Sequence, residues 1–216
     1  MKIGVIGAGG RLGGKLAAEA LDRGHRVTAV VRQTPCGDSR AEILRKSLFE
    51  LTREEASGFD AIISAFGSGF TADPAVNCQA VEHLASLTEG TDVHLILTGG
   101  AGCLYEDGTE DRCVCETPEH PVFLRGISRS LAQGLDALGR RPGVCWTFVC
   151  PSLLLDQDGP RTGDYLTRCD RHILYNEDGQ SYVSYDDLAF AMVDFAEQGL
   201  FQRQLVTVAS RKGGRA

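Results

Sequence analysis

The chain opens with the stretch KIGVIGAGGRLG, residues 2–13, in which a short apolar run leads directly into Gly7, Gly10 and Gly13. This order predicts a strand, a tight turn and the start of a helix. In such a turn Gly7 permits the sharp change of direction, Gly10 lets the backbone approach an anion, and Gly13 lets helix pack on strand. The unpaired N–H groups at the helix start attract phosphate. The stretch predicts a site for the pyrophosphate of a dinucleotide, with a purely structural glycine turn as the alternative.

Apolar runs alternate with helical patterns along the rest of the chain. Helices are expected after Leu12 and at residues 74–88, 123–138 and 185–197. Strands are expected at residues 2–6, 26–31, 46–51, 60–65, 93–98, 145–149 and 205–209. Strands separated by helices of this length require crossover connections, and therefore a parallel sheet covered on both faces. The sequence predicts an α/β fold, a Rossmann-like doubly wound parallel sheet, in a single domain over residues 1–216.

Two stretches interrupt this alternation, residues 103–120 and residues 156–184. The first is polar and acidic, and the second carries short strand candidates around Asp158-Gly159 and Asp178-Gly179. Both follow the carboxyl ends of predicted strands, where open α/β sheets bind their ligands. We expect the two stretches to form the substrate side, the second as a small C-terminal insertion.

Composition and charge limit the classes of partner. The 216 residues carry a net charge of −7, and the basic clusters Arg140-Arg141 and Arg211-Lys212 are short, so no nucleic-acid surface is expected. No apolar run approaches the ~20 residues of a membrane span, and residues 3–6 are too few for a signal-peptide core. We expect a cytoplasmic protein with no membrane partner; a homodimer is left open.

Eight cysteines are scattered along the chain. In a chain without a signal peptide such thiols are expected to be reduced and to pack as small hydrophobes. The one cluster, Cys113-Val114-Cys115 with His120 nearby, lacks the spacing and the second pair of a zinc site. No metal site is expected, and a redox-active pair is the minor alternative.

The end of the second predicted strand indicates which dinucleotide binds. An NAD site carries Asp or Glu there, about 20 residues past the glycines, to bind the ribose 2′-hydroxyl. Here the position is Arg32, 19 residues after Gly13. A guanidinium binds a 2′-phosphate that a carboxylate would repel, and Arg11 in the glycine turn can face the same phosphate or the pyrophosphate. NADP is favoured over NAD, unless Arg32 only begins a solvated loop.

Several segments, covering nearly the whole chain, carry a family resemblance. They are residues 7–13, 30–32, 46–52, 59–67, 98–105, 146–152, 161–165 and 184–189. They resemble the atypical short-chain dehydrogenase/reductase superfamily, and within it the small NAD(P)-binding proteins known as NADH–flavin reductases, kin of NmrA-like and biliverdin/flavin reductase proteins. The segment 98–105 and the Trp-Thr-Phe motif at 146–148 are the more specific; the glycine motif alone is not specific.

The resemblance implies a set of site residues. Its cofactor contacts are Gly7, Gly10, Arg11, Leu12, Gly13, Arg32, Leu48, Ala65, Phe66, Gly67, Thr98 and Pro151. It also implies that the end of the fifth strand lies beside the nicotinamide, where Thr98 and Tyr105 are the candidate catalytic residues that hydrogen-bond a substrate. The alternative is that Thr98 only caps the strand and Tyr105 only covers the pocket.

One departure from the wider superfamily bears on mechanism. Ordinary short-chain dehydrogenases use a Tyr with a Lys four residues on, and no such pair occurs in this chain. Without it an alcohol or ketone is disfavoured, whereas a flavin or a conjugated tetrapyrrole can take a hydride and a solvent proton. We expect an NADPH-dependent reductase of a flavin-like acceptor. The rival hypothesis is a non-catalytic NAD(P)-sensing protein of NmrA-like type; an epimerase or dehydratase would need the missing pair.

Overall fold

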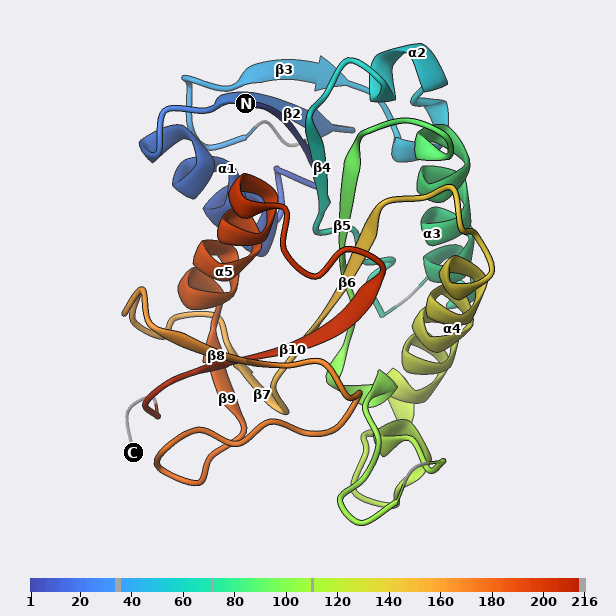
Figure 1. Ribbon diagram of the computed structural model, residues 1–216, viewed down its shortest axis with the longest axis vertical. Helices are drawn as coiled ribbons and strands as arrows, with labels where there is room; N and C mark the ends of the chain where they lie inside the picture. Colours follow the sequence, from blue (N-terminus) through green and yellow to red (C-terminus); the bar gives the residue numbers. More distant parts are fainter. Residues whose placement is uncertain (34–35, 71, 110, 214–216) are drawn as a thin grey trace.

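The computed structural model describes residues 1–33, 36–70, 72–109 and 111–213 and places one large sheet between two layers of helices (Figure 1). The strands are β1 (Lys2–Ile6), β2 (Arg26–Val31), β3 (Glu42–Arg45), β4 (Ala61–Ser64), β5 (His94–Thr98), β6 (Trp146–Pro151), β7 (Leu154–Asp156), β8 (Tyr165–Arg168), β9 (Tyr182–Ser184) and β10 (Gln204–Ser210). The helices are α1 (Arg11–Asp22), α2 (Arg53–Ala56), α3 (Ala75–Thr88), α4 (Val122–Gly139) and α5 (Tyr185–Gln198), with 3-10 turns at Leu48–Glu50, Ala101–Cys103 and Val114–Glu116.

The main sheet has eight strands in the order β3-β2-β1-β4-β5-β6-β10-β8. Neighbouring strands from β3 to β10 run parallel, and β8 is antiparallel to β10 at the edge. Because the chain crosses to the other side of β1 after β3, a crevice opens at the carboxyl ends of β1 and β4, the ligand position of such sheets. The predicted doubly wound α/β fold is confirmed.

Each face of the sheet has its own hydrophobic core. Consecutive residues of β4 point to opposite faces: Ile63 packs in the core with Met192 of α5, and Ile62 packs in the core with Leu84 of α3 and Phe148 of β6, all of them fully buried. Figure 1 shows α1 and α5 on one side of the sheet and α3 and α4 on the other. The strands read as continuous apolar runs because both of their faces are covered.

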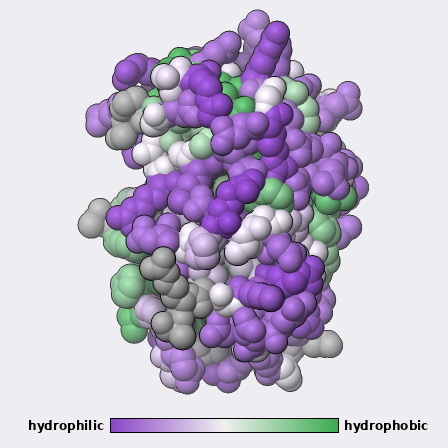
Figure 2. Space-filling view, turned by 90° about the vertical axis from the view of Figure 1, so that its left-hand side faces the viewer, coloured by the Kyte–Doolittle hydropathy of each residue, from purple (hydrophilic) through white to green (hydrophobic). Residues whose placement is uncertain are grey.

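The side of the molecule that carries α1 and α5 is mostly hydrophilic on its outside (Figure 2). Arg23, the C-cap of α1, binds Glu19 at 2.8 Å and, across the helix pair, Asp194 at 2.5 Å and Glu197 at 2.7 Å. Burial would raise the pKa of Glu19, but hydrogen bonds from Arg161 and Arg23 outweigh it and lower that pKa. This ionic network ties the helix that follows the glycine turn to the last helix of the chain.

The structure corrects the third predicted strand. Residues 46–51 are not a strand, since β3 ends just before them and a 3-10 turn follows. Ser47 and Thr52 each begin a helical turn with a capping box, in which the side chains of Glu50 and Glu55 accept hydrogen bonds from their backbone N–H groups. The pattern Ser/Thr-x-x-Glu is a helix-start signal, and it outweighs the apolar content of the segment.

The C-terminal insertion contains short strands near both predicted positions, but the two dipeptides themselves are not in strands. Asp158-Gly159 and Asp178-Gly179 lie in bends and turns: the Asp156 carboxylate accepts the N–H of Asp158 at 3.1 Å, and Gly179 has a φ of 72°. The strands flank these turns instead, as the parallel pair β7–β9 and as β8 at the sheet edge.

The remaining predicted elements lie within two residues of their predicted bounds. Long strands and helices are found reliably because their apolar periodicity is set by burial. In the described part of the chain, no helix combines the length and the apolar character needed to cross a membrane.

Candidate functional site

The glycine turn between β1 and α1 is shaped by its backbone. Gly7 has a φ of 77°, and its N–H donates to the carbonyl of Val30 at 3.1 Å, while the N–H of Gly10 donates to the carbonyl of Gly7 at 2.9 Å. A Cβ on Gly13 would lie only 2.1 Å from that same carbonyl oxygen. Gly10 is the N-cap of α1, so the first N–H groups of the helix, which have no helical partners, begin at this turn.

A pocket of about 560 Å³ begins at the glycine turn and runs past the carboxyl ends of β1, β2 and β4. Seven of the predicted cofactor contacts line it, from segments far apart in the chain: Gly7, Gly10, Arg32, Leu48, Ala65, Phe66 and Gly67. The crevice opened by the strand order is therefore also the place where these residues meet.

The far end of this pocket is positively charged. Arg32, directly after β2, is exposed, and Lys46 borders the pocket while forming an ion pair with Glu55 at 2.5 Å. Among the described residues of the lining there is no carboxylate. Because a guanidinium forms charge-assisted hydrogen bonds with phosphate, this end of the pocket is suited to a phosphate group.

One wall of the pocket is aromatic. The rings of Phe49 and Phe66 meet edge to face with centroids 6.4 Å apart, and Phe49 also lies 5.6 Å from the ring of His83. Phe49 is 41% exposed, whereas its neighbour Leu48 is buried. Such a wall, next to the cationic end, offers apolar surface to a planar base.

Arg11 lies on a different recess, of about 440 Å³, together with Lys15, Asp158 and Asp186. Lys15 Nζ binds Asp186 Oδ2 at 2.6 Å. Arg11 is thus on the side of the glycine turn that meets the C-terminal insertion, away from the lining that holds Arg32. Of its two predicted partners, the pyrophosphate fits this placement better than the 2′-phosphate.

Besides Arg11, four predicted cofactor contacts are not on the lining of the larger pocket: Leu12, Gly13, Thr98 and Pro151. Leu12 and Pro151 are buried, and Gly13 packs against the glycine turn. Thr98 is the last residue of β5, and its Oγ1 donates to Met192 Sδ at 3.8 Å. These residues shape the end of the sheet beside the pocket.

Tyr105 joins the two inserted stretches. Its N–H donates to the carbonyl of Arg171 at 2.7 Å, and the guanidinium of Arg171 lies over its ring, 4.7 Å from the centroid. Arg171 Nη1 also donates to the Tyr105 hydroxyl at 3.3 Å, and His172 packs on the ring edge. The hydroxyl of this candidate residue is therefore engaged by a guanidinium from the C-terminal insertion.

The residues of the cysteine cluster pack inside a loop: Cys113 is partly buried and Cys115 is buried. Burial raises the pKa of the Cys115 thiol. His120 Nε2 lies 3.1 Å from Ser128 Oγ, and burial, with the nearby Arg125, lowers the pKa of this histidine. Within the described ranges no group of three or more His, Cys, Asp and Glu side chains is arranged to hold a metal ion.

Gln33, Ser68, Ala72 and Val76 line the pocket but were not predicted, and of the segment 46–52, which the resemblance places beside the adenine, only Leu48 was named as a contact although Lys46, Ser47 and Phe49 also line the pocket. The capping box of Ser47 is a sequence signal for the turn that carries Ser47 and Phe49. Ser68, Ala72 and Val76 come from the connection between β4 and α3 and the first turn of α3, whose position depends on tertiary packing.

Comparison with known proteins agrees with this geometry. The NAD(P)H-binding family model matches residues 7–198. YwnB, an uncharacterized protein of Bacillus subtilis, is 35% identical over 212 residues, which are 97% of this chain and 99% of that protein. The crystal structure of SP1627 from Streptococcus pneumoniae, described as a putative NADH-flavin reductase, has a TM-score of 0.91 and 35% identity, covering 97% of this chain and 99% of that one.

A protein from Bacteroides thetaiotaomicron, described as a putative epimerase, has a TM-score of 0.83 and 27% identity, with 99% of both chains covered. The family model begins at Gly7, the first glycine of the turn, and extends to the end of α5. The chain therefore belongs to the NAD(P)H-binding family, among the atypical short-chain dehydrogenase/reductase proteins.

Proposed function

We propose that this chain is an NADPH-dependent reductase that passes a hydride to a flavin or a similar conjugated acceptor. Two observations carry the proposal: a glycine turn with an adjoining pocket that suits a dinucleotide, and the pairing of Lys15 and Lys46 with carboxylates, so that among the described residues no lysine side chain hydrogen-bonds a tyrosine. In the glycine turn Gly13 leaves no space for a Cβ, and the pocket beside it measures about 560 Å³. Its fit to a dinucleotide rests on this shape and on its donors.

The cationic end of the pocket supports NADPH as the preferred donor. Arg32 stands where an NAD enzyme presents a carboxylate, and none replaces it in the described lining. The N–H groups at the start of α1 would hold the pyrophosphate, with Arg11 on its outer side. The aromatic wall formed by Phe49 and Phe66 would cover the adenine.

The lysines support hydride transfer without a strong protein acid. The chain has four lysines, of which Lys15 is held by Asp186 and Lys46 by Glu55, 2.6 and 2.5 Å apart. Lys2 begins β1, at the opposite edge of the sheet, and Lys212 follows β10. The Tyr105 hydroxyl meets Arg171 rather than a lysine.

When bound, the reduced nicotinamide supplies the hydride, which reduces an electron-poor ring while solvent supplies the proton and NADP⁺ is left as product. The protein's contribution is then to bind, orient and exclude water around the two rings. An acceptor that needs no protein proton donor fits such a site better than a ketone does.

The test is an anaerobic assay of NADPH oxidation with a panel of flavins, quinones and biliverdin. The proposal predicts reduction of at least one flavin-like acceptor well above the rate without protein, and faster turnover with NADPH than with NADH. No acceptor reduced above background, together with different affinities for NADP⁺ and NADPH, would favour a dinucleotide sensor instead.

A further inference from the structure

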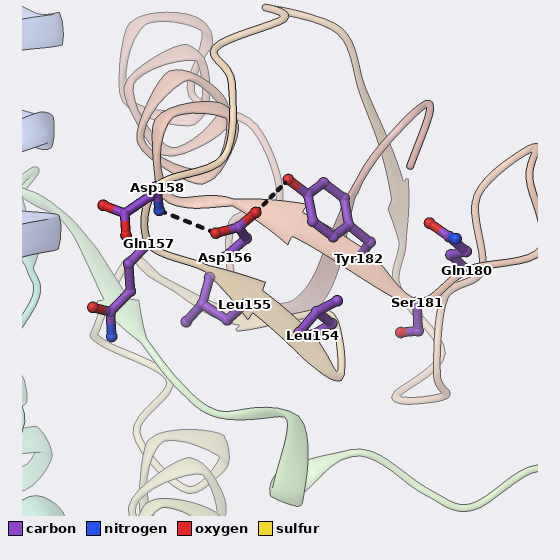
Figure 3. A pocket seen from close by; sticks show the side chains of 8 residues that line it. All are labelled: Leu154, Leu155, Asp156, Gln157, Asp158, Gln180, Ser181 and Tyr182. Atoms are coloured by element: carbon purple, nitrogen blue, oxygen red, sulfur yellow. Dashed lines mark hydrogen bonds between the residues drawn. The ribbon is translucent and has the colours of Figure 1, made fainter. Parts of the chain in front are cut away.

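A third recess lies between β7 and β9. It measures about 630 Å³ and is lined by eight residues, from Leu154 to Asp158 and from Gln180 to Tyr182 (Figure 3). It shares Gln157 and Asp158 with the smaller recess that contains Arg11 of the glycine turn. β7 begins three residues after the end of β6, at the carboxyl edge where ligands bind in such sheets. The β7–β9 recess therefore adjoins the Arg11 recess, on the outer side of the glycine turn.

The recess has a fixed polar wall. Figure 3 shows the side chains of Asp156 and Tyr182 pointing toward each other, and the Tyr182 hydroxyl donates to Asp156 Oδ2 at 3.0 Å. The other carboxylate oxygen accepts the N–H of Asp158 at 3.1 Å. Burial, and then the bond to Asp156, raise the pKa of Tyr182 to about 12, so its hydroxyl stays a donor that holds this carboxylate.

The same recess has an apolar side. Leu154 is 60% exposed at its rim, and Leu155 is partly buried, packed on the core beneath α1 and α5. Gln157 and Gln180 add neutral amides that can donate or accept hydrogen bonds. Exposed leucine beside placed polar groups is the lining of a site for a planar, partly polar ring.

Charge divides this edge of the molecule. Asp156 and Asp158 give the β7–β9 recess two carboxylates, and no Lys or Arg lies among its described lining residues. The dinucleotide side presents Arg32, and the smaller recess presents Arg11, with the charge of Lys15 compensated by Asp186. A phosphate is attracted to one side and repelled from the other.

We propose that the β7–β9 recess is the acceptor site and selects a conjugated heterocycle without a phosphate, such as riboflavin, over its phosphorylated form, FMN. The inference rests on the proposed reductase function and specifies its acceptor. A ring N–H can donate to Asp156 or to a glutamine carbonyl, and the ring can lie on Leu154. The phosphate of FMN brings up to two negative charges near two carboxylates, which lowers affinity by about tenfold at low salt.

The test measures equilibrium binding of riboflavin and of FMN by quenching of flavin fluorescence, with the protein saturated with NADP⁺ so that no turnover occurs. The intact protein should bind riboflavin about tenfold more tightly than FMN, and added salt should narrow the ratio. In the Asp156→Asn/Asp158→Asn double variant the ratio should fall toward one. This variant should keep the fold, because an amide oxygen at position 156 can still accept the hydrogen bond from Tyr182.

Two further variants keep the test decisive. Asp158→Asn alone changes an exposed side chain and should give an intermediate ratio. Asp92→Asn removes the same charge from an exposed position before β5, at the opposite edge of the sheet, and should leave the ratio near its original value. Equal affinities in the intact protein, or a ratio that the recess variants do not move, would overturn the inference while leaving flavin reduction intact. If neither flavin binds and neither is reduced in the NADPH assay, both the inference and the proposal that the acceptor is a flavin are wrong.

Discussion

The glycine turn and the two inserted stretches are built in opposite ways. The turn is local: Gly7, Gly10 and Gly13 lie within seven residues, and at each of them a Cβ would strain or crowd the neighbouring backbone. The inserted stretches are held by pairs far apart in sequence, such as Tyr105 with Arg171 and Asp156 with Tyr182. The difference indicates that the glycine turn tolerates little change in its backbone, whereas the inserted stretches tolerate the loss of single side-chain contacts.

The largest effect is expected at Gly13. Gly13→Ala places a Cβ 2.1 Å from the Gly7 carbonyl oxygen, so α1 must move and the free energy of unfolding should fall by roughly 3 kcal/mol or more. Gly14→Ala is the matched control, because the nearest atom to its Cβ is 3.7 Å away and alanine favours a helix by about 0.5–1 kcal/mol. Chemical denaturation measures both. Equal stability of the two variants would mean that the turn is not tightly packed.

Gly10→Asp should separate binding from folding. Gly10 is the N-cap of α1 with extended backbone (φ −86°, ψ 171°), a position that aspartate favours, and this preference offsets the close contact of its Cβ with the Gly7 carbonyl oxygen at 3.2 Å, so the variant should still fold. Its carboxylate would occupy the place of the pyrophosphate, and NADPH affinity should fall by more than about a hundredfold. Gly10→Asn, of similar size without charge, should lose less. Unchanged NADPH titration in the folded Gly10→Asp variant would show that the pyrophosphate does not bind at this turn.

Arg32→Asp should change the choice of dinucleotide. Loss of a guanidinium–phosphate contact costs about 1.5–3 kcal/mol, roughly 10- to 150-fold in NADPH affinity, while NADH affinity should hold or rise. Arg32→Gln, which removes the charge without reversing it, should give a smaller shift. Fluorescence titration with both dinucleotides measures the ratio, and an unchanged ratio would remove Arg32 from the site.

The smallest effects are expected at the two candidate catalytic residues, Thr98 and Tyr105. Thr98→Val and Tyr105→Phe should each slow acceptor reduction by about 2- to 12-fold, the value of a neutral hydrogen bond of about 0.5–1.5 kcal/mol. Tyr175→Phe, whose hydroxyl binds Asp107 on the surface, serves as the control and should have no effect on rate. A roughly thousandfold loss of the reduction rate in Tyr105→Phe, with NADPH binding intact, would show that Tyr105 is a general acid. Carbonyl compounds would then be the favoured substrates.

The sequence predicts the parts of this molecule that depend on local rules. The glycine turn and the long helices are predicted because φ, burial and periodicity act over a few residues. The apolar content of residues 46–51 predicts a strand, although the glutamates at positions 50 and 55 mark capping boxes. The hydrogen bond between Asp156 and Tyr182 joins residues 26 positions apart, so no local sequence pattern predicts it.

The most direct test of the central claim, that the glycine turn and Arg32 form one dinucleotide site, is a crystal structure of the protein with NADP⁺. We expect the pyrophosphate on the N–H groups that begin α1, the adenine against Phe49 and Phe66, and the 2′-phosphate within hydrogen-bond distance of the Arg32 guanidinium. A dinucleotide bound elsewhere, or one at the turn with its 2′-phosphate directed away from Arg32, would contradict the account.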